Sequence, residues 1–145
     1  MSRPPPNPRA PAPEISLLHA ARAAASAFSN AADFQDEAAR FENLVASHLL
    51  KLVHWLHDRE GYAAKLYFLR DTSKREVDFL VTVDEKVWFA VEAKSQDQAV
   101  SANLRYFRDK LKIPFSYQAL RKEGVDRFSD GVRVLSAGKL LAALI

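Results

Sequence analysis

The sequence predicts an α/β fold in which helices flank a mixed β-sheet. Two patterns favour this class: helical segments with apolar residues at three- and four-residue spacing, and short β-rich segments that only polar turns separate. The expected order is a helix, three strands, a helix, a strand, another strand and a closing helix. With 145 residues, the chain is long enough for one domain with a substantial core.

The first long helix is expected from Asp36 to about His57. Its apolar positions recur as on one face of a core helix: Phe41, Leu44, Val45, His48, Leu49, Leu52, Trp55 and Leu56. Three β-rich segments follow, Lys65–Arg70, Glu76–Val83 and Val87–Lys94, and they are expected to form an antiparallel meander.

The remaining elements are expected in the C-terminal part of the sequence. Residues 97–112 are expected to form an amphipathic helix that ends at Pro114 and packs on the meander. Phe115–Leu120 and Val132–Ser136 read as strands, and Gly138 to Ile145 as an apolar helix.

The N-terminal part differs in composition from the rest. Six of the seven prolines lie in the first 13 residues, so residues 1–14 are expected to be a disordered arm. Residues 15–32 are rich in alanine and predict a short helix. Residues 33–145 are then the folded domain.

Composition excludes several function classes. The chain has no cysteine, which excludes thiol nucleophiles, iron–sulfur clusters and cysteine-based zinc sites. No apolar run is long enough for a membrane span, so a cytoplasmic protein without a membrane partner is expected. The formal charge is +3, and residues 100–145 hold nine of the 21 basic but only four of the 18 acidic residues. Solvated helix faces explain this excess more simply than a nucleic-acid surface does.

The candidate site lies where charges interrupt apolar strands. Alternation places Glu76, Asp78 and Leu80 on one face of their strand and Val77, Phe79, Val81 and Val83 on the other. If Asp84-Glu85-Lys86 is a three-residue loop, Asp78 faces Glu92 and Glu76 faces Lys94. A loop two residues longer or shorter would instead pair Asp78 with Lys94, or Glu76 with Glu92, and leave an ordinary ion pair or none.

Two carboxylates that face each other across a hairpin stand about 4.5–5.5 Å apart at Cβ and repel each other unless positive charge lies between them. Lys94 or a divalent cation must supply it. Carboxylate oxygens suit Mg²⁺ or Mn²⁺. Asp78, Glu92 and Lys94 could therefore support metal-dependent hydrolysis of a phosphodiester, with Lys94 positioning the attacking water or stabilising charge.

These residues resemble a known superfamily. Asp78, then Glu92-Ala93-Lys94, preceded by a helix that carries Glu42, resembles the PD-(D/E)XK nucleases, whose restriction-endonuclease-like core is a helix, a three-strand meander, a helix and a further strand. Val77 stands where the superfamily has its proline.

The resemblance is closer to one group of domains. Four segments look like the uncharacterised C-terminal domain that follows an AAA-type ATPase in many bacterial and archaeal proteins: Phe41-Glu42-Asn43, Tyr67-Phe68-Leu69-Arg70-Asp71, Glu76-Val77-Asp78-Phe79-Leu80 and Val91-Glu92-Ala93-Lys94-Ser95. It covers residues 35 to 145.

The resemblance implies roles residue by residue. Asp78, Glu92 and Glu42 would bind Mg²⁺ or Mn²⁺, and Lys94 would assist the attacking water. Arg70 and Glu76 flank the site as candidate substrate-binding groups. The implied activity is that of an endo- or exodeoxyribonuclease, with DNA as its substrate.

Other candidates have weaker support. Arg105 and Arg108 could contact phosphates, although Asp109 interrupts their patch. The histidines of the long helix, His48, His54 and His57, and the aromatic residues are explained better by a helix surface and by core packing. No P-loop spacing occurs among the glycines, so P-loop nucleotide binding is excluded.

Two function classes therefore remain open. One is a metal-dependent nuclease, and the other is a catalytically silent domain of the same fold that docks a separate ATPase chain. A homodimer is compatible with either class.

Overall fold

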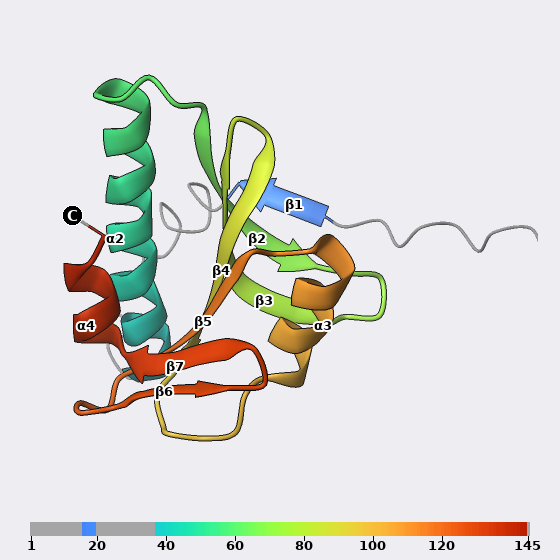
Figure 1. Cartoon of the computed structure of the whole chain (residues 1–145), viewed down its shortest axis with the longest axis vertical. Helices are drawn as coiled ribbons and strands as arrows, with labels where there is room; N and C mark the ends of the chain where they lie inside the picture. The colour runs from blue at the N-terminus through green and yellow to red at the C-terminus, as the bar shows by residue number, and fades with distance from the viewer. Residues whose placement is uncertain (1–15, 20–36, 145) are drawn as a thin grey trace, which may run out of the picture.

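The computed structural model describes residues 16–19 and 37–144 (Figure 1). The elements in chain order are β1 (Ser16–His19), α2 (Glu37–Asp58), β2 (Ala64–Arg70), β3 (Glu76–Val83), β4 (Lys86–Lys94), α3 (Ala102–Leu111), β5 (Phe115–Leu120), β6 (Asp126–Ser129), β7 (Val132–Ser136) and α4 (Ala137–Ala142). The strands form one seven-stranded sheet in the order β1-β2-β3-β4-β5-β7-β6. Because β5 runs parallel to β4 and β7 while the other neighbours are antiparallel, the sheet is mixed and the predicted fold class is confirmed.

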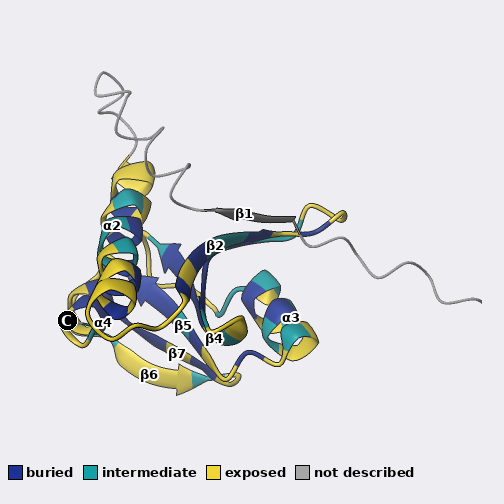
Figure 2. Ribbon diagram, turned by 90° about the horizontal axis from the view of Figure 1, so that it is seen from above, coloured by how far each residue is buried: buried dark blue, intermediate teal, exposed yellow. Residues whose placement is uncertain are grey.

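Helices cover both faces of the sheet (Figure 2). On one face, α2 and α4 enclose a core that includes Phe79, Val81 and Phe89. On the other, α3 covers a second core through Leu104 and Phe107, which are fully buried. The central strands are thus buried on both sides, as their nearly continuous apolar sequences require.

Helix α2 confirms the predicted long helix to within one residue at each end. Its buried residues follow the helical period and pack on the sheet: Phe41, Val45, Ala46, Leu49, Leu52, Val53 and Leu56. Leu44 and Trp55, which the sequence placed in the apolar stripe, are 50% and 41% exposed and lie at its margin. His54 and His57 are exposed and His48 is half-buried, in agreement with their assignment to the helix surface.

A β-bulge interrupts the pairing of β2 with β3. Tyr67 pairs with Leu80 but Leu69 pairs with Val77, so Phe68 lies opposite two residues, Asp78 and Phe79. The extra residue breaks the expected alternation of faces. Val77 consequently packs in the α3-side core together with Leu80, whereas the sequence pattern placed Val77 with Phe79 and Val81.

The β3–β4 connection also corrects the sequence interpretation. Val83 pairs with Lys86, so the turn has two residues, Asp84 and Glu85, both at positive φ. Such a turn matches the twist of a hairpin. The expected pairing of Val83 with Val87 is therefore wrong, but Trp88 is an extra residue in β4 that restores the predicted register at Phe79 and Val91.

Helix α3 begins five residues later than predicted because hydrogen bonds to Gln118 hold its N-terminal flank outside the helix. The fully buried Gln118 accepts a hydrogen bond from Ser101 N–H (2.9 Å) and donates to the carbonyls of Gln98 and Ala99 (3.3 and 3.2 Å). Ser101 Oγ in turn caps Leu104 N–H. The helix ends at a left-handed Lys112, two residues before Pro114.

Strands β5 and β7 have the predicted bounds, and α4 is shorter than the predicted closing helix. Strand β6 was not predicted, since Asp126–Ser129 is largely exposed and shows no apolar pattern; pairing with β7 alone defines it.

The N-terminal predictions are tested only in part. Most of the helix expected over residues 15–32, and the whole arm over 1–14, lie outside the described residues. The described part, Ser16–His19, is a strand and not a helix. Its backbone pairs with β2, which would otherwise present unpaired groups at the sheet edge. Within the described residues, no helix is long and apolar enough to cross a membrane.

Two buried polar residues of β5, Gln118 and Ser116, should differ in how the loss of their polar group changes the free energy of unfolding. Gln118→Leu leaves two carbonyls and one N–H of residues 98–101 without their partner, and we expect it to lower the free energy of unfolding by roughly 1–3 kcal/mol. Ser116 Oγ is buried and has no hydrogen-bond partner among the described residues. Ser116→Ala should therefore leave stability unchanged or raise it. Urea denaturation of both variants checks this, and equal losses would contradict it.

Candidate metal and phosphodiester site

The candidate site forms where β3 and β4 separate. Beyond the Phe79–Val91 pair, side chains replace the backbone ladder: Glu92 Oε2 accepts a hydrogen bond from Asp78 N–H (3.2 Å), and Asp78 Oδ2 accepts one from Ala93 N–H (2.8 Å). The bulge at Asp78 and Phe79 lies at this point of β3. Asp78 and Glu92 are thus adjacent, as the predicted register required.

Lys94 and Glu42 complete the group. Lys94 Nζ lies 2.8 Å from Glu92 Oε1. Glu42 is an exposed residue of α2, yet its charge acts on both Asp78 and Lys94. All four residues predicted for the site therefore come into one electrostatic environment.

Burial makes the negative charge of this group costly. Glu92 is 5% exposed and Asp78 is half-buried. Burial, followed by repulsion from Glu92 and a smaller repulsion from Glu42, raises the pKa of Asp78 to about 7, although Ala93 N–H and Lys94 oppose the shift. The sequence predicted repulsion between these carboxylates, but burial is the larger cause of the raised pKa of Asp78.

Lys94 supplies the compensating charge. Burial alone would lower the pKa of Lys94, but the hydrogen bond and charge of Glu92, together with Asp78 and Glu42, outweigh burial and raise it. Lys94 is therefore charged at neutral pH, and it neutralises only part of the three-carboxylate group.

The sequence did not single out Arg121, which lies beside this group. Strands β4 and β5 are parallel, so Arg121, just after β5, meets the end of β4 and donates its N–H to the Lys94 carbonyl (3.2 Å). Its guanidinium pairs with Glu37 at the start of α2. Arg121, Glu37 and Arg40 line a shallow hollow together with Phe41 and Leu44. The signal in the sequence was a basic residue directly after a predicted strand, but its closeness to Lys94 depends on which strands are neighbours.

The predicted substrate-binding residues already have partners. Arg70 pairs with Glu76 across the β2–β3 ladder (3.2 Å). Arg105 lies 3.7 Å from Asp130. Arg108 pairs with Asp109 (2.9 Å) and also donates to the Asp130 carbonyl in the β6–β7 turn. Both α3 arginines are therefore engaged in ion pairs, as Arg121 is with Glu37.

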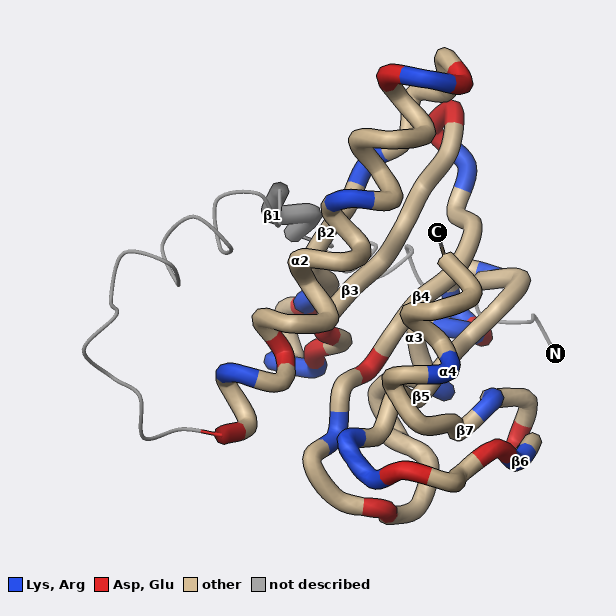
Figure 3. The backbone as a smooth tube through the Cα atoms, turned by 90° about the vertical axis from the view of Figure 1, so that its left-hand side faces the viewer, with Lys and Arg blue, Asp and Glu red and all other residues tan. Residues whose placement is uncertain are grey.

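Basic and acidic residues also alternate along the β5–β6 connection and β6, with Arg121, Lys122, Asp126 and Arg127 within a few residues of one another (Figure 3). Arg127 and Lys122 both pair with Asp97. The C-terminal excess of basic residues is thus largely engaged in ion pairs at the surface.

The oxygen ligands that this site offers are of the kind that a hard divalent cation prefers. The adjacent groups are carboxylates, which Mg²⁺ and Mn²⁺ prefer, and their uncompensated negative charge is what a cation would relieve. Among the described residues no group of three His, Cys, Asp or Glu side chains is already gathered closely enough to hold an ion. Asp78 and Glu92 would therefore be the protein ligands, with Glu42 acting at longer range and water completing the coordination.

One family model matches most of the chain. Residues 38–140 match the family described as "Domain of unknown function (DUF4143)", and the chain belongs to this family. The match spans the segment from α2 to α4 and includes all four candidate site residues. Neither the curated proteins nor the solved structures contain a match.

The raised pKa of Asp78 predicts a pH-dependent stability. An unfolded aspartate titrates at about 3.9. Between about pH 4 and 7 the unfolded state has lost this proton while the folded state keeps it, so the free energy of unfolding must fall as the pH rises through this window. Asp78→Asn removes the titration. We expect the stability difference, wild type minus Asp78→Asn, to fall between pH 4 and 7 and to level off above pH 8 in denaturant titrations. Parallel pH profiles for the two proteins would contradict this.

Proposed function

We propose that this domain is a divalent-cation-dependent nuclease that hydrolyses phosphodiester bonds of DNA, and that its fold is that of the PD-(D/E)XK nucleases. The observation that carries the proposal is the meeting of Asp78, Glu92 and Lys94 where two strands separate, with negative charge left over in a partly buried site. A purely structural ion pair would need only one of these carboxylates.

Each residue has a distinct role in this proposal. Asp78 and Glu92 would hold Mg²⁺ or Mn²⁺, which when bound supplies Lewis acidity toward a phosphate oxygen and acidifies water. Ala93 N–H orients Asp78, and Asp78 N–H orients Glu92, so both carboxylates are fixed before the substrate arrives. Lys94 would donate hydrogen bonds to the attacking water or to the phosphate oxygen that gains charge.

The surroundings support an extended anionic substrate. Arg121 is anchored through its backbone to Lys94, and Arg40 shares a hollow with it. We propose that these two residues contact DNA phosphates, a role that the sequence interpretation gave to Arg105 and Arg108. A cytoplasmic location, expected because the sequence has no cysteine and no long apolar run, would give the domain access to DNA.

A second candidate is a catalytically silent domain of the same fold that docks a separate ATPase. The observation in its favour is the 2.8 Å contact of Lys94 with Glu92, which already neutralises one of the two prospective ligands. In that case Lys94 would act as a structural counter-ion, and the site would hold no cation.

Nuclease activity should depend on three side chains. The full chain with Mg²⁺ or Mn²⁺ should cleave single-stranded, double-stranded or branched DNA, and chelator should abolish cleavage. Asp78→Asn, Glu92→Gln and Lys94→Met should each lower the rate by at least about a hundredfold, because each removes a group that acts in the transition state. The double variant of Asp78 and Glu92 should lose little more than either single one, since the two act as a unit.

The matched control is Asp58→Asn, which alters an 80% exposed carboxylate at the end of α2 and should keep full activity. Circular dichroism spectra and unfolding midpoints verify that the variants are folded. Absence of metal-dependent cleavage, alone and with a candidate ATPase, would favour the silent domain. Cleavage that survives Asp78→Asn would show that the chemistry lies elsewhere.

A further inference from the structure

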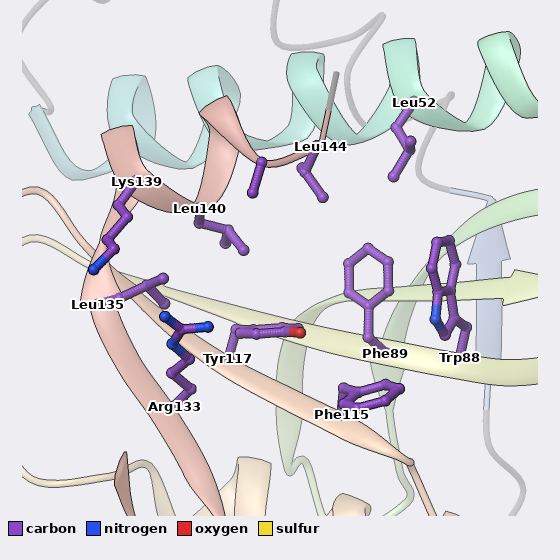
Figure 4. Close-up of a pocket in the computed structure, with 11 residues that line it drawn as sticks. Leu52, Trp88, Phe89, Phe115, Tyr117, Arg133, Leu135, Lys139, Leu140 and Leu144 are labelled. Atoms are coloured by element: carbon purple, nitrogen blue, oxygen red, sulfur yellow. The ribbon is translucent and has the colours of Figure 1, made fainter. Parts of the chain in front are cut away.

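A second hollow lies between the sheet and the two helices on one of its faces. It has a volume of about 470 Å³ and is bounded by α2, α4, β4, β5 and β7. Its walls are mainly aromatic and aliphatic, with Trp88, Phe89, Phe115, Tyr117, Leu140 and Leu144 turned toward the space (Figure 4). The volume is in the range of pockets that bind small organic molecules.

The bulge in β4 builds one wall of this hollow. In a regular strand the consecutive residues Trp88 and Phe89 would point to opposite faces of the sheet. Trp88 is the extra residue of the bulge, and both rings line the hollow, where they meet edge to face with centroids 4.9 Å apart. A bulge that re-aims a large side chain in this way is characteristic of binding sites.

Large apolar surface stays accessible on these walls. Phe115 is 54% exposed and Trp88 is 36% exposed, although both belong to strands of the central sheet. Phe89 packs edge to face on Tyr117, and these two rings form the floor of the hollow. The hollow therefore offers a preformed apolar surface that a ligand could cover without a rearrangement of the core.

One end of the hollow is positively charged. Arg133 on β7 and Lys139 on α4 line this end, opposite Trp88 (Figure 4). Both pair with a single carboxylate, Asp126, so two cations face one anion. The side chains of Arg133 and Lys139 remain 46% and 57% exposed and can accept a further anionic partner.

We infer that this hollow binds an amphipathic organic anion, with its apolar body on the aromatic walls and its carboxylate beside Arg133 and Lys139. The apolar lining favours an aliphatic or aryl body over a nucleobase, because a buried base needs hydrogen-bond partners that leucine and phenylalanine side chains lack. The site is separate from Asp78 and Glu92, and it does not depend on the proposed nuclease activity.

Trp88 provides a direct reporter of this site. The chain has two tryptophans, so Trp55→Phe leaves Trp88 as the only one. Decanoate and decanol, which share an alkyl body and differ in charge, are titrated into this full-length variant below the micellar concentration of decanoate and the solubility limit of decanol. Decanoate should shift Trp88 emission to the blue with saturation, and it should bind roughly fivefold to tenfold more tightly than decanol, as one hydrogen bond of ordinary strength would give.

Charge variants test the anionic end. In the Trp55→Phe background, Arg133→Gln with Lys139→Gln should remove the preference for decanoate and keep the binding of decanol. Arg127→Gln is the matched control, since it alters an exposed arginine that pairs with Asp97. Phe115→Ser should weaken both ligands and tests the apolar wall even if the double variant fails to fold.

Two kinds of result would contradict this inference. A linear, unsaturated change in Trp88 emission would indicate non-specific partitioning and would overturn the inference. Equal affinities for decanoate and decanol, or a preference for decanoate that survives the Arg133 and Lys139 substitutions, would overturn the assignment of an anion site.

Discussion

The β-bulge at Asp78 and Phe79 is the constraint on which the candidate site depends. It inserts one residue opposite Phe68, so β3 cannot continue its regular ladder with both neighbours at once. The backbone pairing with β4 gives way here to hydrogen bonds from Asp78 and Ala93 N–H to carboxylate oxygens. A regular strand would satisfy these N–H groups with carbonyls, and the two facing carboxylates would then not be held by the backbone.

The sheet around the bulge determines the electrostatics of the site. Two cores, one under α2 and α4 and one under α3, bury β3 and β4 on both faces and remove water from around Glu92. Burial is the largest cause of the raised pKa of Asp78, so the packing of the helices, and not the proximity of charges alone, makes the carboxylates responsive to a cation. The parallel pairing of β4 with β5 then places Arg121 beside Lys94.

Periodicity predicted those features that depend on local pattern. The bounds of α2 and β3 and the adjacency of Asp78 and Glu92 follow from apolar spacing and from the hairpin rule. The two-residue turn at Asp84 and the bulge at Trp88 were not predictable, because their effects on the register cancel and leave the same pairing at Val91. The position of Arg121 depends on which strands are neighbours, and that is a tertiary property.

Titration of the Asp78 carboxyl carbon by NMR, with and without Mg²⁺, tests directly whether Asp78 and Glu92 form a cation site. We expect a midpoint near pH 7 in the metal-free protein, since burial and Glu92 disfavour the charged form. Saturating Mg²⁺ should move this midpoint downward, because the cation stabilises the carboxylate. A midpoint near the ordinary value of an aspartate without metal, or a midpoint that Mg²⁺ leaves unchanged, would show that the two carboxylates do not form this site.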